Sequence, residues 1–175
     1  MTGVQTCAIP IFQDVFEPEY ERNAQAWAAQ LEPVRDDPLL IGYFLDNEPQ
    51  WAFSRQLPAV AMLETGMPSA TRTALTLWLK ERYKGDIGAL NKAWGQSFSS
   101  FEALGQGSLR RPEEFSSQSR DDLTAFSELM VQRCLEPPYR EARRADPNHL
   151  NLGIRWAGLG SGFLEEFCAT QEEID

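Results

Sequence analysis

A short apolar run that stops abruptly at charged residues constrains the fold of this chain more than any other stretch. The run Leu39–Leu45 is followed by Asp46, Asn47 and Glu48 and is bounded by a proline on each side. Its length is typical of a strand buried on both faces, as in a parallel sheet covered by helices. Because charged groups are costly inside such a strand, we expect Asp46 and Glu48 at its carboxyl end, where α/β folds carry their chemistry.

A second strand is predicted over residues 149–156. Its apolar residues alternate from Leu150 to Trp156, and the segment closes on Arg155 and Trp156. Two strands separated by helical crossovers indicate a parallel sheet with right-handed connections, so the two carboxyl ends can share a rim. Periodicity alone does not separate a closed barrel from an open doubly wound sheet.

The remaining pattern is helical. Helices are expected over residues 19–34, around 57–64, from Ser69 or Thr71 to about Gly85, over 87–94 between Asp86 and Gly95, and from Ser119 or Asp121 onward. Pro137 and Pro138 are expected to break or kink the last of these helices. Helical structure that follows a strand's carboxyl end is typical of loops that wall an active site.

Composition argues against several classes of partner and cofactor. The formal net charge of −10 argues against nucleic acid or an anionic membrane as a partner. No apolar run is long enough to span a bilayer. The three cysteines are far apart and lack the spacing of a zinc site or a disulfide framework, so no metal or other cofactor is predicted.

Glu48 is the predicted catalytic acid. It ends an apolar strand and is close in sequence to the aromatic residues Trp51 and Phe53. Asn47 beside it offers both a donor and an acceptor, which suits a sugar hydroxyl. Composition alone leaves open the alternative that Asn47 and Glu48 merely begin a turn or helix before Pro49.

Other residues near the two strand ends are candidates for substrate contacts. Trp51 and Trp156 can stack on the apolar faces of sugars, whereas the tryptophans at helical spacing are expected in the core. Arg155 can hold a substrate hydroxyl or position a carboxylate, and the alternative is an ion pair that shapes the rim. His149 is the only histidine and precedes its strand, so we expect it to have a structural role.

Three segments in this order resemble retaining glycoside hydrolases of the (β/α)8-barrel clan, in particular the family 50 β-agarases and the related family 42 β-galactosidases. Residues 41–48 resemble the fourth strand with its Asn-Glu ending. Residues 78–95 resemble the helical insertion that follows, and residues 146–155 resemble the fifth strand with its approach. The resemblance implies an α/β fold, namely a partial TIM barrel of about strands four to six, with a helical insertion at about 52–117.

The resemblance also implies roles for individual residues. Glu48 would be the general acid/base of a double displacement on a β-galactoside or agarose-type linkage, and Asn47 would bind the 2-hydroxyl of the sugar. Asp46, Trp51, Arg155 and Trp156 would contact the oligo- or polysaccharide. The nucleophilic Glu of the clan ends the seventh strand, which we expect to be missing from this chain. Another β-glycanase of the clan, or a non-catalytic carbohydrate-binding barrel, stays open as an alternative.

The ends of the sequence look arbitrary. Residues 1–11 resemble the translation of a sequencing adapter and match a signal peptide poorly, so we expect them to be non-native. Residues 12–175 would then be an incomplete barrel domain, inactive and poorly stable alone because an open barrel exposes sheet edges and apolar helix faces. The sequence carries no signal for a compartment or an oligomeric state.

Overall fold

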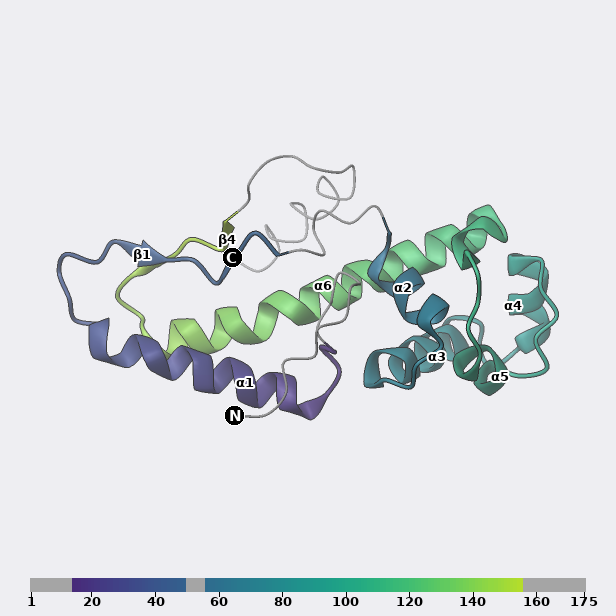
Figure 1. The fold of residues 1–175 in the computed structure, drawn as a ribbon, viewed down its shortest axis with the longest axis horizontal. Coiled ribbons are helices and arrows are strands. Elements are labelled where there is room, and N and C mark those ends of the chain that lie inside the picture. The colour runs from purple at the N-terminus through teal and green to yellow at the C-terminus, as the bar shows by residue number, and fades with distance from the viewer. Residues whose placement is uncertain (1–13, 50–55, 156–175) are drawn as a thin grey trace.

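The computed structural model describes residues 14–49 and 56–155. Helices dominate this part of the chain, and the long helix α6 (Ser117–Ala145) runs along most of its length (Figure 1). Helix α1 (Pro18–Ala28), which continues as the 3-10 helix η1 (Ala29–Val34), packs beside one half of α6. The helices between the two strand regions pack around its other half.

Local capping determines where those intervening helices begin and end. They are α2 (Pro58–Thr65), α3 (Ala70–Arg82), α4 (Ile87–Trp94), α5 (Phe101–Gln106) and the 3-10 helix η3 (Pro112–Glu114). The Ser69 hydroxyl accepts the Arg72 amide at 3.0 Å and so caps α3. Asp86 caps α4, and Gly95, with φ of 67°, ends it. The helices predicted at the positions of α2, α3 and α4 are confirmed, whereas α5 and η3 were not predicted.

Of the break or kink predicted for the last helix, the break is wrong, because α6 continues through Pro137 and Pro138. Proline has no amide hydrogen, so Pro138 cannot bond the carbonyl oxygen of Cys134 one turn earlier. That oxygen instead accepts the Tyr20 hydroxyl of α1 at 2.5 Å. A contact from another helix therefore replaces one of the hydrogen bonds that the prolines remove.

Helix α6 also begins earlier than its sequence predicts. Ser116 and Ser119 form a reciprocal capping pair, in which each side chain bonds the backbone amide of the other residue. The helix therefore starts at Ser117, before the predicted start at Ser119 or Asp121.

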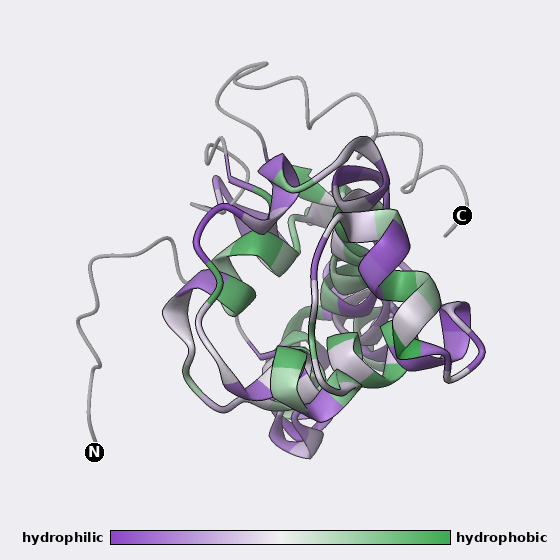
Figure 2. Ribbon diagram, turned by 90° about the vertical axis from the view of Figure 1, so that its right-hand side faces the viewer, coloured by the Kyte–Doolittle hydropathy of each residue, from purple (hydrophilic) through white to green (hydrophobic). Residues whose placement is uncertain are grey.

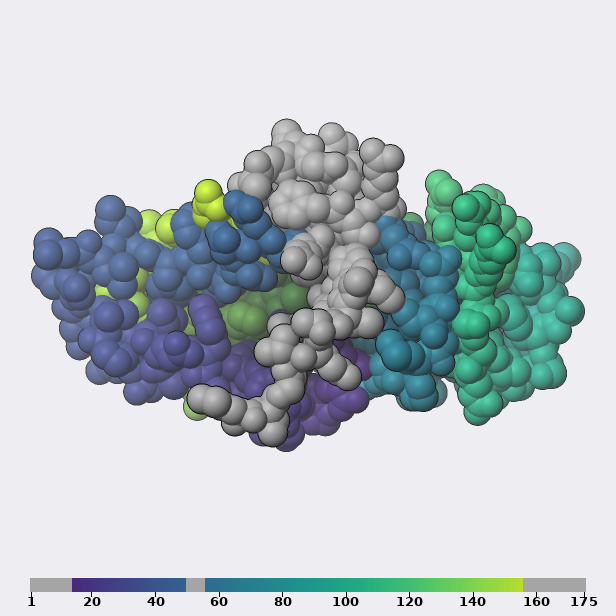
Figure 3. All heavy atoms as spheres, viewed as in Figure 1, coloured from purple at the N-terminus to yellow at the C-terminus, as the bar shows by residue number. Residues whose placement is uncertain are grey.

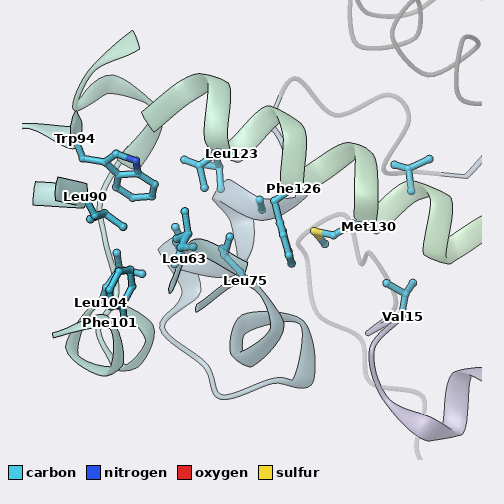
Figure 4. Packing of buried hydrophobic residues seen from close by; sticks show 14 of the residues in the cluster. Val15, Leu63, Leu75, Leu90, Trp94, Phe101, Leu104, Leu123, Phe126 and Met130 are labelled. Carbon is cyan, nitrogen blue, oxygen red and sulfur yellow. The ribbon is translucent and has the colours of Figure 1, made fainter. Parts of the chain in front are cut away.

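The core lies between α6 and the intervening helices (Figure 4). Leu123, Phe126 and Met130 project from α6 and are fully buried. Leu75 of α3 and Trp94 of α4 are fully buried as well. Each such side chain contributes about 1.5–3 kcal/mol by leaving water. The helices carry both apolar and polar segments, as expected for helices with one buried side (Figure 2).

Two buried charged side chains tie these helices together. Arg72 donates hydrogen bonds to carbonyl oxygens at the ends of two helices. In α2 the acceptors are Met62 and Leu63, and at the end of α5 they are Gly105 and Gly107. Asp122 of α6 accepts hydrogen bonds from Tyr83, Arg82, Gln118 and Trp94. Buried charges need such partners, so both are structural parts of the helical region.

The two strand regions lie side by side and are parallel, as predicted. β1 (Gly42–Tyr43) pairs with β3 (Leu150–Asn151), and β2 (Asp46–Asn47) pairs with β4 (Ile154–Arg155). Gly42 lies opposite Leu150 and Asp46 opposite Ile154, so both pairs keep one register. The regular pairing is interrupted at Gly153, whose φ of 68° departs from strand geometry.

The prediction that the first strand is buried on both faces is wrong for the described residues. Leu39 is 89% and Ile41 is 77% exposed, and Leu150 and Leu152 are exposed as well, whereas Ile154 is buried. Helix α6 contacts β3, but the described residues supply no second helical layer for the other face. Figure 3 shows the blue segment that includes β1 and β2 at the surface beside α1.

None of the described helices is both long enough and apolar enough to cross a membrane.

Candidate functional site

The carboxyl ends of β2 and β4 meet at one edge, as expected for parallel strands. The Leu45 amide donates to the Gly153 carbonyl oxygen at 2.7 Å, and the Glu48 amide donates to that of Arg155 at 2.8 Å. Asn47 lies opposite Arg155 in the register. The structure therefore brings Asn47, Glu48 and Arg155 together from segments that are far apart in the sequence.

A single guanidinium nitrogen connects these three residues. Arg155 Nη1 donates to Asn47 Oδ1 at 2.9 Å and to Glu48 Oε1 at 2.5 Å. The side chains of Arg155 and Glu48 are 53% and 37% exposed. Exposed ion pairs of this kind stabilise a fold by about 0.2–1 kcal/mol, so the contact matters more for geometry than for stability.

Glu48 has a left-handed backbone, with φ of 52°. In a regular strand neighbouring side chains point to opposite faces, so Asn47 and Glu48 would be directed apart. The left-handed turn at Glu48 redirects its carboxylate so that the guanidinium that binds Asn47 can reach it too. A non-glycine residue in this conformation costs about 1–3 kcal/mol, and such strain is concentrated at functional sites.

Asp46 makes a different contact. Its Oδ1 accepts the backbone amide of Asn47 at 2.7 Å. Burial raises the pKa of the Cys134 thiol of α6 to about 11, and the charge of Asp46 adds to the rise while a hydrogen bond from Tyr20 opposes it. The predicted substrate contact of Asp46 stays a prediction.

The predicted aromatic contacts cannot be placed. Trp51 and Trp156 lie outside the described residues. Three tryptophans at helical spacing are expected in the core. Trp94 is fully buried and Trp78 packs on the core against Phe126, whereas Trp27 of α1 is only partly buried and is not part of the core cluster.

His149 lies at the opposite end of the strand pair, directly before β3, and is 8% exposed. Its Nδ1 is 2.7 Å from Asp146 Oδ2, and its Nε2 is 3.0 Å from the Asp37 carbonyl oxygen. These contacts, that with Asp146 above all, raise the pKa of His149. Both ring nitrogens face acceptors, so the imidazolium satisfies this setting best. The histidine links the end of α6 to the loop before β1.

Metal-ligand geometry is not found in this part of the chain. Within residues 14–49 and 56–155, no three or more His, Cys, Asp or Glu side chains gather closely enough to hold a metal ion. The described residues at the strand ends can perform acid–base chemistry at Glu48 and hydrogen bonding by Asn47 and Arg155.

Comparison with known proteins gives two kinds of match, although the sequence matches no protein-family model. β-Agarase B of Vibrio sp. (strain JT0107) is 28% identical over 155 residues, which cover 84% of this chain and 16% of that protein. The chain therefore spans only a small part of the length of this curated relative.

Two solved agarase structures share the fold. The agarase AgWH50C matches with a TM-score of 0.74 at 26% identity, over 86% of this chain and 22% of that one. An exo-β-agarase matches with a TM-score of 0.69 at 28% identity, over 83% of this chain and 20% of that one. These matches support the resemblance to the family 50 β-agarases and a partial α/β domain. The likeness to family 42 and the TIM barrel stay predictions.

Proposed function

We propose that the full-length form of this protein is a retaining glycoside hydrolase that cleaves agarose-type or other β-galactosidic linkages, with Glu48 as its general acid/base. One observation carries the proposal. Glu48 and Asn47 lie together at the carboxyl end of a parallel strand pair, in a chain that is similar to β-agarases. The substrate would be an oligo- or polysaccharide.

The proposed chemistry is a double displacement. In the first step Glu48 donates a proton to the glycosidic oxygen while a second carboxylate attacks the anomeric carbon, so the leaving group departs as an alcohol. In the second step Glu48 removes a proton from the water that displaces the carboxylate. A retaining mechanism needs the two carboxyl groups roughly 5–5.5 Å apart. We expect the nucleophilic Glu from a part of the full-length protein outside this chain.

Asn47 is proposed to bind the 2-hydroxyl of the sugar. Its Oδ1 accepts from Arg155, so the amide donors of Asn47 lie on the other side of the group, where they can serve a hydroxyl oxygen. Hydrogen bonds to the 2-hydroxyl that strengthen in the transition state contribute several kcal/mol to catalysis.

In the proposed fold, residues 12–175 form about the fourth to sixth strands of a (β/α)8 barrel. Helices α2 to α5 would belong to the insertion at about 52–117, after the fourth strand. The parallel neighbours β2 and β4 and the agarase folds support this arrangement. Residues 1–11 would not belong to the natural domain.

The experiment is Glu48→Gln in the full-length protein. We expect turnover of an agaro-oligosaccharide, whose leaving group is poor, to fall by about 10²–10⁴-fold. Departure of a good leaving group from an aryl β-galactoside needs no proton, so kcat/KM for that substrate, which reports the first step, should fall far less, although the water step still needs Glu48 as a base. The matched control is Glu32→Gln, an exposed carboxylate of η1.

Unchanged turnover of the oligosaccharide by a folded Glu48→Gln protein would refute the acid/base role. Binding of the oligosaccharide without any turnover by the wild type would favour a carbohydrate-binding barrel. Turnover of another β-glycan in place of agarose would favour another glycanase of the clan.

A further inference from the structure

Arg155 holds Glu48 by both its backbone and its side chain. The Arg155 carbonyl oxygen accepts the Glu48 amide at 2.8 Å, and its Nη1 donates to Glu48 Oε1 at 2.5 Å. The same nitrogen donates to Asn47 Oδ1 at 2.9 Å. One residue of β4 thus fixes the orientation of both polar groups at the end of β2.

The left-handed backbone of Glu48 makes such support necessary. A non-glycine residue persists in this conformation only where its surroundings hold it. Pro49 adds to the strain, because a residue before proline prefers an extended backbone. Among the hydrogen bonds of the described residues, the Glu48 amide donates to the Arg155 carbonyl oxygen and the Glu48 carboxylate accepts from the Arg155 guanidinium.

The contact also selects the oxygen that carries the proton. Glu48 Oε1 accepts from Arg155, and a guanidinium has no acceptor. A proton held by the carboxyl group therefore resides on Oε2, the oxygen turned away from the guanidinium. That oxygen is the one from which Glu48 can donate to a leaving group.

We propose that Arg155 is a positioning residue for the acid/base: it acts through Glu48 and Asn47 and does not itself bind the sugar. The inference rests on the proposed function and replaces the predicted substrate contact of Arg155. Proton transfer requires the donor and acceptor within about 2.6–3.2 Å, so a Glu48 carboxyl that is no longer held loses its reach. Substrate affinity depends on other groups and should change little.

The test compares Arg155→Met and Arg155→Lys in the full-length protein. Methionine keeps the backbone contact but removes the charge and the donors, and lysine restores one charged donor group. For Arg155→Met we expect kcat on an agaro-oligosaccharide to fall by about 10–100-fold with KM nearly unchanged, because misplaced groups cost rate. Arg155→Lys should recover part of kcat. Arg35→Met, at an exposed arginine beside Asp36, is the matched control.

The decisive arm repeats Arg155→Met in the Glu48→Gln background. Once the acid is gone, Arg155 no longer acts through Glu48 and keeps only its contact with Asn47, so the second substitution should lower kcat by clearly less than the same substitution does in the wild type. An equal loss in both backgrounds, or a large rise in KM, would show direct substrate binding and overturn the inference. If Glu48→Gln lowers kcat but Arg155→Met does not, the positioning role alone fails. If Glu48→Gln has no effect, the proposed function fails first.

Discussion

The left-handed backbone of Glu48 is the single-residue feature on which the candidate site depends most. Lys84 and Arg111, with φ of 52° and 51°, share this conformation but lie where helices end or begin. Glu48 instead follows a strand directly, and its conformation turns its carboxylate to the guanidinium that Asn47 also contacts. Strain at this residue is therefore linked to one arrangement of polar groups.

His149 gives a prediction about stability and pH. Its pKa is raised above the ordinary value of 6.5, chiefly by the hydrogen bond with Asp146. A raised pKa in the folded state means that the stabilisation is complete below about pH 6.5 and is lost as the pH rises through the folded value. Between about pH 6 and about pH 8, thermal denaturation should therefore show a falling Tm for the wild type and a smaller fall for His149→Gln.

Asp146, the partner of His149, sets the pH dependence of this contact at low pH. Burial opposes its ionisation, but hydrogen bonds with His149 and Asn148 outweigh burial and lower its pKa from 3.8. Its contribution is therefore present above that value and is lost as the pH falls through the lowered one. Identical pH dependence of Tm in the wild type and in His149→Gln would show that the buried contact does not titrate.

Among the strands and helices, the β1–β3 pairing depends on a close approach at Gly42. A Cβ atom there would lie 2.4 Å from the Leu150 carbonyl oxygen, and a backbone oxygen cannot move aside without disturbing the pairing. We expect Gly42→Ala to lower the free energy of unfolding by about 1–3 kcal/mol, measured as a shift of the urea midpoint. Gly107→Ala is the control, because its Cβ would meet no atom closer than 3.9 Å. Equal midpoints for both variants would contradict the close approach.

The sequence predicted helices better than it predicted what surrounds the strands, for a physical reason. Asp86 and Gly95 bracket α4 through contacts within a few residues, so the pattern alone located it. In α6, the Cys134 carbonyl oxygen that Pro138 leaves without an amide partner accepts the hydroxyl of Tyr20, which is more than a hundred residues away in sequence. No local rule contains that contact, so the local rule for proline allowed a break that does not occur.

At the candidate site, too, the sequence predicted local features but not long-range contacts. The apolar run ending at Asp46 predicted where Glu48 would lie, and the second strand predicted that Arg155 would share its edge. The register that sets Asn47 opposite Arg155 arises only when the strands pair. The left-handed backbone of Glu48 is also unexpected from sequence, because a residue before proline prefers an extended backbone. Sequence reasoning therefore found the participants but not the contacts between them.

In the described part of the chain, the helices bury most of the apolar side chains and the strand segments bury few of them. Side chains of α2 to α6 fill one continuous core, whereas the strand segments leave Leu39, Ile41, Phe44, Leu150 and Leu152 exposed. Backbone hydrogen bonds open more readily where little apolar contact surrounds them. The strand pair is therefore expected to open before the helical core does.

Hydrogen exchange on the 175-residue chain measures this difference. We expect the amides of Leu45, Leu150 and Leu152, which bond across the strand pair, to exchange more than about tenfold faster than those in the middle of α6. In the full-length protein a closed barrel would cover the strands, so the same amides should become about as slow as those of α6. Equal protection of strand and helix amides from exchange in the 175-residue chain would show that the strand pair opens no more readily than the core.

Fast exchange of the strand amides in the full-length protein would contradict the proposed barrel, because a closed barrel leaves no sheet edge open.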